Sequence, residues 1–295
     1  MAIELGPNQY GKAEVRVVAV DRSTARHAIK DLTVSSALRG DFAGAHLAGD
    51  NGHVLATDTQ KNTVYAFARD GIGEIEDFGL RLARHFAGAY PWIGGARVEI
   101  AEHGWDRVAV GGAGHDHAFA RAGAEVRTTV VTVDGDTEHV LSGLTGLVVL
   151  KTTGSAFAGF PRDRYTTLAE TDDRILATAV TARWRHTGRP DWPASFAAVR
   201  TALLETFATL PSDALQQTLY EMGRTALLTD PELAEIRLSM PNKHHFLQDL
   251  APFGLDNPKV VYHAADRPYG LIEGTVRRDD VPAADVAWQG TPGFC

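Results

Sequence analysis

The chain has 295 residues, 44% of them hydrophobic and 22% charged, which is typical of a globular protein with one large domain or two ordinary ones. The formal net charge is −8 and no long lysine–arginine cluster occurs, so a nucleic-acid partner is not expected. The single cysteine, Cys295, excludes an intrachain disulfide and a cysteine-ligated metal site, and it favours a reducing compartment. Without a signal-peptide pattern or an apolar run that could span a bilayer, we expect a cytoplasmic protein with no membrane partner.

The first half of the chain alternates between sheet and helix patterns. Apolar residues at every second position indicate strands, and apolar residues four apart, such as Phe78, Leu82 and Phe86, indicate a helix. Thr57 and Asp58 precede another apolar run, as N-cap residues do, and predict a helix that begins there. The expected strands lie at 14–20, 27–38, 96–101, 108–110 and 125–133, and the expected helices at 57–67 and 75–86.

The second half repeats this order after a turn at Asp134-Gly-Asp136, near which we place the domain boundary. The dipeptide Trp192-Pro193 predicts the start of a long helix, because proline is favoured in a first helical turn. The expected strands lie at 147–150, 174–184, 234–240 and 259–263, and the expected helices at 192–210 and 213–228. Strands outnumber helices and form hairpins, so the sequence predicts an α+β fold of antiparallel sheets backed by helices. The predicted domains are 1–135 and 136–295, the second ending in an irregular tail after residue 278.

Most of the candidate polar and aromatic residues have an ordinary structural role when each is considered alone. No Gly-x-Gly-x-x-Gly follows a strand and no phosphate loop occurs, so a nucleotide cofactor is not indicated. His115 and His117 follow a glycine-rich stretch and have no third ligand nearby, so we expect a solvated turn rather than a metal site. Taken singly, Thr57 and Asp58 fit a helix cap, Gln216 a helix-surface amide, Arg174 a surface ion pair and Phe157 a core position.

Asn242 and His244 form the most informative pair of the sequence. They lie two residues apart at the end of the predicted strand 234–240, and the period of a strand puts both side chains on one side. An amide and an imidazole held side by side can bind a small polar molecule and move its protons. Because the chain has no familiar cofactor motif, its chemistry is expected to come from side chains of this kind.

Several short motifs, taken together and in chain order, resemble those of the urate oxidase (uricase) family. The motifs are Tyr10-Gly-Lys12, ATDTQKN at 56–62, LKTTGSAF at 150–157 with Gly159-Phe160, Asp173-Arg-Ile-Leu176, Leu215-Gln216 and PNKHHF at 241–246. Each motif is weak evidence alone. Together they are in register from Tyr10 to Gly274, which is nearly the whole chain.

The resemblance implies a fold, an assembly and a reaction. The fold is two tandem tunnelling-fold domains, each an antiparallel sheet backed by helices, and the assembly is a homotetramer with active sites between subunits. The reaction is the oxidation of urate by O2 to 5-hydroxyisourate and hydrogen peroxide in purine degradation. The resemblance implies that neither a metal nor an organic cofactor takes part.

The resemblance also assigns the substrate-binding residues. Phe157 is expected to stack on the purine ring, while Arg174 and Gln216 hold opposite edges of the substrate. The backbone N–H groups of Leu215 and Asp58 are expected to donate to the substrate, and Asp58 is also expected to cap its helix.

A proton relay is implied for Lys12, Thr57 and His244. A threonine hydroxyl needs a neighbour that takes its proton, and Lys12 can do so in the neutral form that burial favours. His244 titrates near working pH and can pass protons to water or peroxide. Asn242 is expected to hold O2 or water above the ring. In the family, Lys12 and Thr57, which also contacts substrate, would belong to one subunit and the other residues to its neighbour.

Departures from the family pattern, among them Ala158 where a larger residue is common, and two other functions complete the expectations. His245 and Gln217 differ from the residues common in the family, and both are expected to point away from the substrate. One alternative is a zinc-dependent pterin or purine enzyme of the same fold, which would need a metal cluster and an acidic anchor where this chain has Gln216. The other is a non-catalytic purine-binding protein, against which the presence of all three relay residues argues.

Overall fold

The structure is a computed structural model that describes residues 2–265 and 267–291, and these residues form two compact units. Unit 1 holds residues 2–143 together with Ala283–Gln289, and unit 2 holds Leu144–Pro282 together with the described residues from Gly290 onward. Each unit is an antiparallel sheet with helices packed on it, as the α+β prediction requires. The single cysteine of the chain, Cys295, lies outside the described residues.

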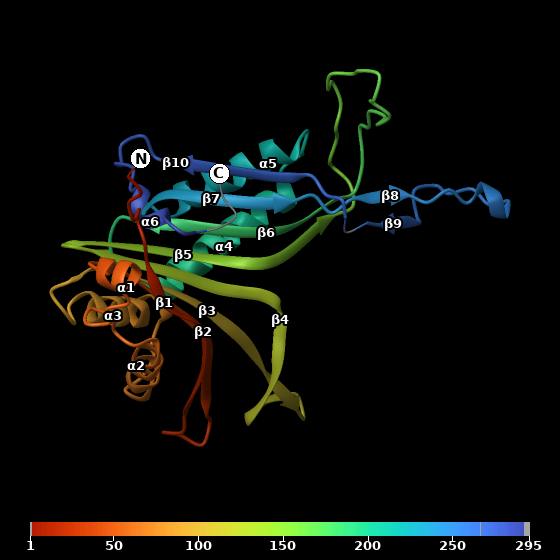
Figure 1. Ribbon diagram of the computed structural model, residues 1–295. Helices are drawn as coiled ribbons and strands as arrows, with labels where there is room; N and C mark the ends of the chain where they lie inside the picture. The colour runs from red at the N-terminus through yellow and green to blue at the C-terminus, as the bar shows by residue number, and fades with distance from the viewer. Residues whose placement is uncertain (1, 266, 292–295) are drawn as a thin grey trace. The chain divides into compact units, whose positions relative to one another are not determined.

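The sheet of unit 1 runs in the order β1-β2-β3-β4-β5, with helices against it (Figure 1). Helix α2 packs on β1, and α3 packs on β2, β3 and β4. The strands are β1 (Tyr10–Asp21), β2 (Ala28–Gly40), β3 (Ile93–Val110), β4 (Ala113–Asp134) and the first part of β5 (Thr137–Lys151), and the helices are α1 (Ala43–Ala48), α2 (Thr57–Arg69), α3 (Ile75–Ala87) and α6 (Asp285–Trp288).

Alternating burial explains why the helices lie where they do in unit 1. In β2 the side chains of Leu32, Val34 and Leu38 are fully buried, while the residues between them are mostly less so. Helix α3 buries Phe78 and Phe86 completely on its sheet-facing side, and burying each such ring contributes roughly 1.5–3 kcal/mol. The predicted helix at 75–86 is therefore confirmed, and Phe78, Leu82 and Phe86, spaced four residues apart, form its buried stripe.

Three details of unit 1 differ from the sequence prediction. The two short strands expected at 96–101 and 108–110 are one strand, β3, which turns at Gly111 and Gly112 (φ 60° and 84°) into β4. Those two glycines make a tight turn possible, so His115 and His117 lie in strand β4 and the expected solvated turn there was wrong. Helix α2 has Ala56 as its N-cap, and no side chain caps it.

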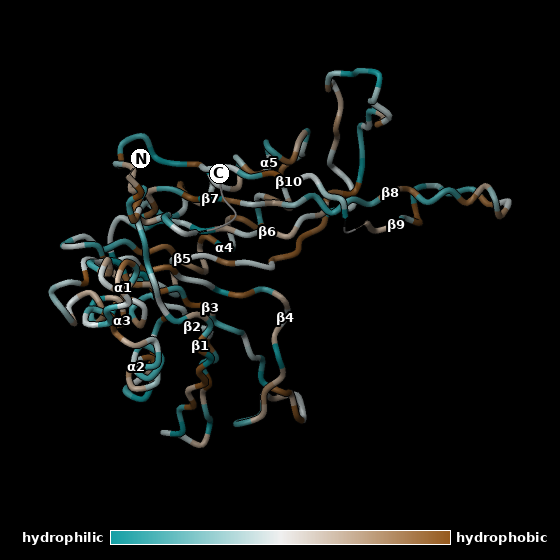
Figure 2. The backbone as a smooth tube through the Cα atoms, viewed as in Figure 1, coloured by the Kyte–Doolittle hydropathy of each residue, from teal (hydrophilic) through white to brown (hydrophobic). Residues whose placement is uncertain are grey.

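The sheet of unit 2 runs in the order β5-β6-β7-β10, and a separate ribbon pairs β8 with β9. Helices α4 and α5 pack on each other, and α5 packs on β7 and β10. The elements are the second part of β5, β6 (Leu176–His186), α4 (Trp192–Thr209), α5 (Leu215–Thr229), β7 (Leu233–Pro241), β8 (His245–Leu247), the 3₁₀ turn η1 (Ala251–Phe253), β9 (Tyr262–Ala264) and β10 (Leu271–Arg277). Polar and apolar segments both occur along β8, β9 and the loop that joins them (Figure 2).

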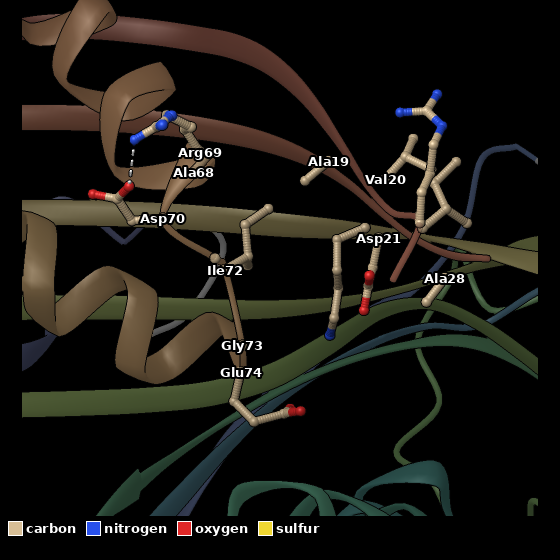
Figure 3. Close-up of a pocket in the computed structure, with 14 residues that line it drawn as sticks. Ala19, Val20, Asp21, Ala28, Ala68, Arg69, Asp70, Ile72, Gly73 and Glu74 are labelled. Atoms are coloured by element: carbon tan, nitrogen blue, oxygen red, sulfur yellow. Dashed lines mark hydrogen bonds and ion pairs between the residues drawn. The ribbon is translucent and has the colours of Figure 1, made fainter. Parts of the chain in front are cut away.

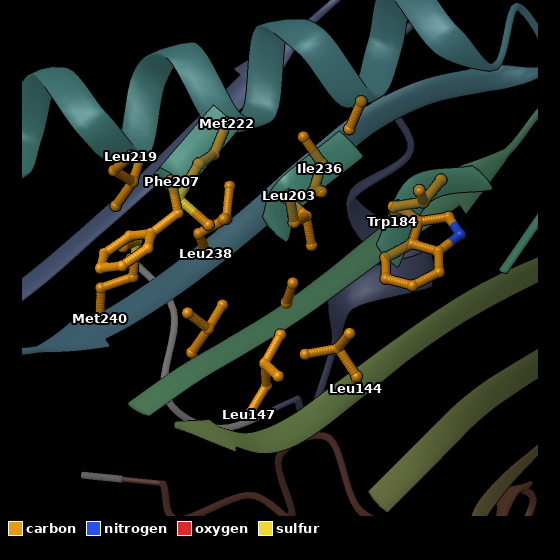
Figure 4. Close-up of a cluster of buried hydrophobic side chains, with 14 of the residues drawn as sticks. Leu144, Leu147, Trp184, Leu203, Phe207, Leu219, Met222, Ile236, Leu238 and Met240 are labelled. Atoms are coloured by element: carbon orange, nitrogen blue, oxygen red, sulfur yellow. The ribbon is translucent and has the colours of Figure 1, made fainter. Parts of the chain in front are cut away.

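The core of unit 2 lies between its helices and the inner face of its sheet (Figure 4). Phe207 of α4 and Met222 of α5 meet Trp184 of β6 and Leu238 of β7 in one buried cluster. Leu144 joins this cluster, whereas Leu141, three residues earlier in β5, packs in a different cluster of unit 1. We expected the division at residue 135, but the compact units divide within β5 because its two parts pack in different cores.

The segment after β10 is more ordered than predicted. The sequence suggested an irregular tail, but Asp285–Trp288 form helix α6. Trp288 is only 7% exposed and packs with Val130 and Leu141 of unit 1. The prolines and glycines of this segment suggested irregular structure. A single buried tryptophan has no periodicity, so the sequence pattern could not predict that Trp288 packs in the core.

Candidate functional site

A cavity of about 470 Å³ opens in unit 2 where loops from four elements meet. The loop after β5, the segment before β6, the first turn of α5 and the chain after β7 all contribute side chains. The sequence-predicted residues that line it are Phe157, Arg174, Leu215, Gln216, Asn242 and His244. The sequence therefore named residues that the tertiary structure brings to one place.

Backbone hydrogen bonds fix Phe157 beside Arg174. The N–H of Phe157 donates to the carbonyl of Thr171 at 2.8 Å, and the N–H of Thr171 donates back at 3.0 Å. The N–H of Arg174 donates to the carbonyl of Ser155 at 2.8 Å. These bonds join the two ends of the connection between β5 and β6, so the backbones of Phe157 and Arg174 keep a fixed separation.

The Phe157 ring has a partner of its own in Phe160. The two rings are stacked, with centroids 5.0 Å apart and planes 15° apart. The guanidinium carbon of Arg174 lies 5.1 Å from the centroid of the Phe157 ring. A cation near an aromatic face is attracted by the ring quadrupole. The cavity thus contains a flat apolar surface next to a positive charge.

Arg174 carries a charge that no described carboxylate neutralises. Burial lowers the pKa of its guanidinium from the ordinary value, although an arginine stays protonated in a protein. Its Nε is buried and has no hydrogen-bond partner among the described residues, and no ion pair of Arg174 occurs within them. A buried donor without a partner is costly, so this group is ready for an anionic ligand.

The first turn of α5 lines the cavity with Leu215 and Gln216. The N-cap is Ala214, which offers no side-chain acceptor, and Leu215 and Gln216 begin the helix. The unpaired N–H groups and the dipole of a helix start favour a negative ligand. Gln217 turns away, as predicted, because its Oε1 accepts the N–H of Asp213 at 3.0 Å.

Asn242 and His244 both line the cavity, although the backbone has left the regular strand on whose period the prediction rested. Strand β7 ends at Pro241, and Asn242 continues the extended backbone by donating its N–H to the carbonyl of Gly270 at 2.8 Å. Burial first, and then the charge of Arg174, lower the pKa of the His244 imidazole from 6.5. This shift favours the neutral imidazole, which can accept a proton.

His245 corrects one expectation. It lines the cavity instead of pointing away, and its Nδ1 lies 3.0 Å from the carbonyl oxygen of Lys243. The physical reason is that the backbone between β7 and β8 is not a regular strand, so strict alternation of sides does not hold there. Further lining residues that sequence reasoning did not assign to the site are Leu168, Ala169, Thr171, Ile175, Phe246, Leu247 and Ile272.

Lys12, Thr57 and Asp58 belong to unit 1. Lys12 is half-buried on β1, and Thr57 is the first residue of α2. The pKa of Asp58 is lowered chiefly by its hydrogen bond to Lys61, with the charge of Lys12 as a smaller cause. The prediction that Asp58 caps the helix was wrong, because its carboxylate accepts from Lys61 and Asn62 one turn later.

A second cavity, of about 580 Å³, lies in unit 1 between the ends of β1 and β2 and the loop that joins α2 to α3 (Figure 3). Its charged lining residues are Asp21, Arg22, Lys30, Arg69, Asp70 and Glu74. These side chains carry both signs, and Arg69 pairs with Asp70 at 3.3 Å. None of its lining residues is aromatic. It therefore lacks the flat aromatic face of the unit 2 cavity.

Two further properties bear on the alternatives. Within residues 2–265 and 267–291, no group of three or more His, Cys, Asp or Glu side chains is arranged to hold a metal ion. In the same part of the chain, none of the helices has the length and apolar character needed to cross a membrane.

Comparison with known proteins decides the family. The model of the Uricase family matches residues 8–132 and 140–273. The chain belongs to this family. It is 58% identical to the uricase of Arthrobacter globiformis over 294 residues, which cover 99% of this chain and 96% of that protein. It is 38% identical to the uricase of Dictyostelium discoideum over 277 residues, which cover 92% of this chain and 96% of that protein.

The fold comparison agrees with the sequence comparison. The crystal structure of the Arthrobacter globiformis uricase superimposes with a TM-score of 0.93 at 57% identity, covering 98% of this chain and 99% of that one. The antiparallel α+β architecture predicted from the order of the elements is the architecture of this family.

Proposed function

We propose that this protein is a urate oxidase that converts urate, O2 and water to 5-hydroxyisourate and hydrogen peroxide. The observation that carries the proposal is the unpaired guanidinium of Arg174 beside the flat face of Phe157 in the unit 2 cavity. A planar purine anion needs such a surface and such a charge. The uricase names of its relatives support the same substrate.

Urate binding uses the whole lining of the cavity. The purine ring stacks on Phe157, and the fork of Arg174 donates to one edge of the anion. The side-chain amide of Gln216 can donate and accept on the opposite edge, and the backbone N–H of Leu215 adds a donor at the open helix start. Asn242 is placed to hold O2 or water over the ring. Each contact fixes orientation, which is most of what a reaction between two bound reactants requires.

The chemistry divides between electron transfer and proton transfer. Urate loses two electrons, which O2 takes up together with two protons to form hydrogen peroxide, and water supplies the hydroxyl group of the product. The neutral imidazole of His244 accepts and returns protons at the cavity. Lys12 and Thr57 complete the relay, with Thr57 passing its proton to Lys12. No step of this scheme calls for a metal or an organic cofactor.

The relay and the cavity are proposed to come from different copies of the chain in a homotetramer. The cavity of unit 2 has no lysine among its lining residues, whereas Lys12, Thr57 and Asp58 belong to unit 1. A second copy could bring these three residues to the open side of the cavity. The backbone N–H of Asp58 would then donate to urate beside Thr57. We also propose a cytoplasmic location, in keeping with the acidic composition.

The decisive experiment follows the loss of the urate absorbance band together with O2 uptake by protein freed of metal with a chelator. We expect one O2 consumed and one peroxide released for each urate. Loss of activity in chelator, restored by zinc, would instead favour the zinc-dependent pterin or purine enzyme. Tight urate binding without turnover would favour a non-catalytic purine-binding protein.

A further inference from the structure

Strand β1 has a bulge immediately after Lys12. Its pairing with β2 matches Lys12 to Ser36 and Val15 to Val34, so the bulged strand has an additional residue between the two pairs. Glu14, inside the bulge, has a φ of 56°, which is uncommon for a residue with a side chain. Bulges leave backbone groups outside the regular ladder and re-aim the neighbouring side chains.

Two serine hydroxyls of β2 accept the N–H groups that the bulge releases. The N–H of Glu14 donates to Ser35 Oγ at 2.9 Å, and the N–H of Lys12 donates to Ser36 Oγ at 3.4 Å. Adjacent strand residues point to opposite faces, so these two hydroxyls hold the bulge from its two sides. Only Ser36 faces the helix side, where it is buried.

Ser36 continues this contact into helix α2 through Gln60. The hydroxyl of Ser36 donates to Gln60 Oε1 at 2.8 Å, and Gln60 Nε2 donates to the carbonyl of Leu55 at 3.3 Å. The hydroxyl of Tyr10 donates to the same carbonyl at 3.2 Å. A continuous chain of hydrogen bonds therefore runs from the backbone of Lys12 to the residue that precedes the N-cap of α2.

Gln60 is a buried polar residue, so its side-chain amide needs hydrogen-bond partners inside the protein. The side chain is 0% exposed, and the next buried residues on the same face of α2 are Val64 and Ala68. An apolar side chain would satisfy the packing, whereas a buried amide is costly unless its polar atoms are bonded. The bonds to Ser36 and Leu55 use both ends of this amide.

The spacing between β1 and β2 is also fixed at this point. A Cβ atom on Gly11 would lie 1.8 Å from the carbonyl oxygen of Ser36, so only glycine lets the strands approach this closely. The close approach brings Ser36 Oγ within reach of Lys12. It also means that the position of Lys12 depends on Ser36 and not on a flexible strand end.

We propose that the Ser36–Gln60 hydrogen-bond chain is a positioning element that holds Lys12 in register with the first turn of α2, which begins at Thr57. The inference rests on the proposed roles of Lys12 and Thr57 in proton transfer. Ser36 and Gln60 touch neither reactant and act through Lys12. A relay between two side chains tolerates little displacement, because a shift of 1 Å in a reacting group can cost about 100-fold in rate.

The test compares Gln60→Met, Ser36→Ala and the double variant in urate oxidation. Methionine fills the buried site without hydrogen-bonding as an amide does. We expect each single variant to lower kcat about tenfold or more while KM changes less than about threefold. The double variant is expected to be no slower than the slower single variant, because both changes break the same chain. Additive losses, or a rise in KM with kcat unchanged, would overturn the proposal.

Val64→Ala is the matched control for simple destabilisation. It lies one turn further on the same buried face of α2 and removes packing without touching the hydrogen-bond chain. We expect a lower Tm with kcat close to that of the unmodified protein. If Val64→Ala lowers kcat as much as Gln60→Met at an equal loss of Tm, the effect of Gln60 is stability alone and the proposal fails.

A second readout is independent of urate turnover. Hydrogen exchange of the Lys12 amide reports the bond to Ser36 directly, and we expect it to become at least about tenfold faster in Ser36→Ala and in Gln60→Met than in Val64→Ala. Unchanged exchange would overturn the positioning role even in an active enzyme. Faster exchange in a protein that does not oxidise urate would instead refute the proposed function and retain the structural link.

Discussion

Helices α2 and α5 begin in the same way but are anchored differently. Both follow an alanine N-cap without a side-chain acceptor, Ala56 in unit 1 and Ala214 in unit 2. In α5 the anchor is a pair of hydroxyls, with Ser212 Oγ 2.6 Å from Thr218 Oγ1. In α2 the anchor is the buried amide of Gln60. A different group therefore secures each first turn, although both helix starts lack a side-chain cap.

The difference teaches how the two units divide the work. In unit 2 the helix start lines the same cavity as the ring of Phe157 and the unpaired guanidinium of Arg174, and these groups suit the binding of a planar anion. In unit 1 the helix begins at Thr57 and lies near the charge of Lys12, and we propose that these two residues move protons. Substitutions of Lys12 and Thr57 in unit 1 should therefore act on kcat, and substitutions of Phe157 and Arg174 in unit 2 on binding.

The largest effect is expected from the relay of unit 1. Lys12→Met or Thr57→Ala should lower kcat about 10²- to 10⁴-fold, as the loss of a positioned proton acceptor does, with little change in the affinity for a non-reactive purine anion. Steady-state kinetics and calorimetry measure the two quantities. The control is Lys30→Met, which removes a lysine of β2 that pairs with Glu102 of β3. It should leave both kcat and the affinity for the anion unchanged. Equal losses in rate and affinity would mean that the relay residues only bind.

The next effect belongs to the cation of unit 2. Arg174→Ala should weaken binding of a purine anion by about 2–5 kcal/mol, because the partner charge and its donors are removed together. Calorimetric titration with the anion measures this directly. Arg224→Ala removes a surface arginine that pairs with Glu221 on α5 and should have no effect. Unchanged affinity in Arg174→Ala would contradict the assignment of the cavity.

The third effect is a dependence of the free energy of unfolding on pH, and we attribute its direction to His186 of unit 2. Burial lowers the pKa of this imidazole to about 4 from 6.5, so between these pH values the unfolded chain binds a proton that the folded chain does not. The contribution of His186 to stability should be fully present above pH 6.5. As the pH drops towards 4, the free energy of unfolding should fall by at most about 3 kcal/mol. Denaturant unfolding across this range measures the slope. His186→Phe should flatten it, and a slope that persists in this variant would exclude His186 as the cause.

The smallest effect is expected at Phe160. Its ring stacks on Phe157, and Phe160→Leu should raise KM only a few-fold, since an aromatic pair contributes about 0.5–1.5 kcal/mol beyond its burial. Steady-state kinetics measure the change. Phe253→Leu alters an exposed phenylalanine in the loop between β8 and β9 and is the control. A large loss of kcat in Phe160→Leu would show that the Phe157–Phe160 ring pair also orients the substrate for reaction.

Much of the fold and of the candidate site could be predicted, because both are marked by local sequence patterns such as helical periodicity and short motifs. Helix α3 was predicted almost to its ends, since Phe78, Leu82 and Phe86 repeat with the period of a helix. Arg174 and Phe157 were named from motifs, and the structure brings them together at one cavity. The long hairpin of β3 and β4 was not predicted, because its outer part is exposed on both faces and lacks apolar alternation. Gln60 was passed over, because an amide inside a helix has no pattern that marks it as buried.

The sequence by itself determined helices α2 to α5, the family resemblance and the chemical groups available for binding and proton transfer. These follow from side-chain identity and from periods of two and 3.6 residues, which are local properties of the chain. Only the tertiary structure decided that Phe157 stacks on Phe160, that His245 turns into the cavity and that Ser36 reaches Gln60. The reason is physical. Each of these outcomes depends on how separate loops or strands pack and hydrogen-bond, and no local pattern encodes those contacts.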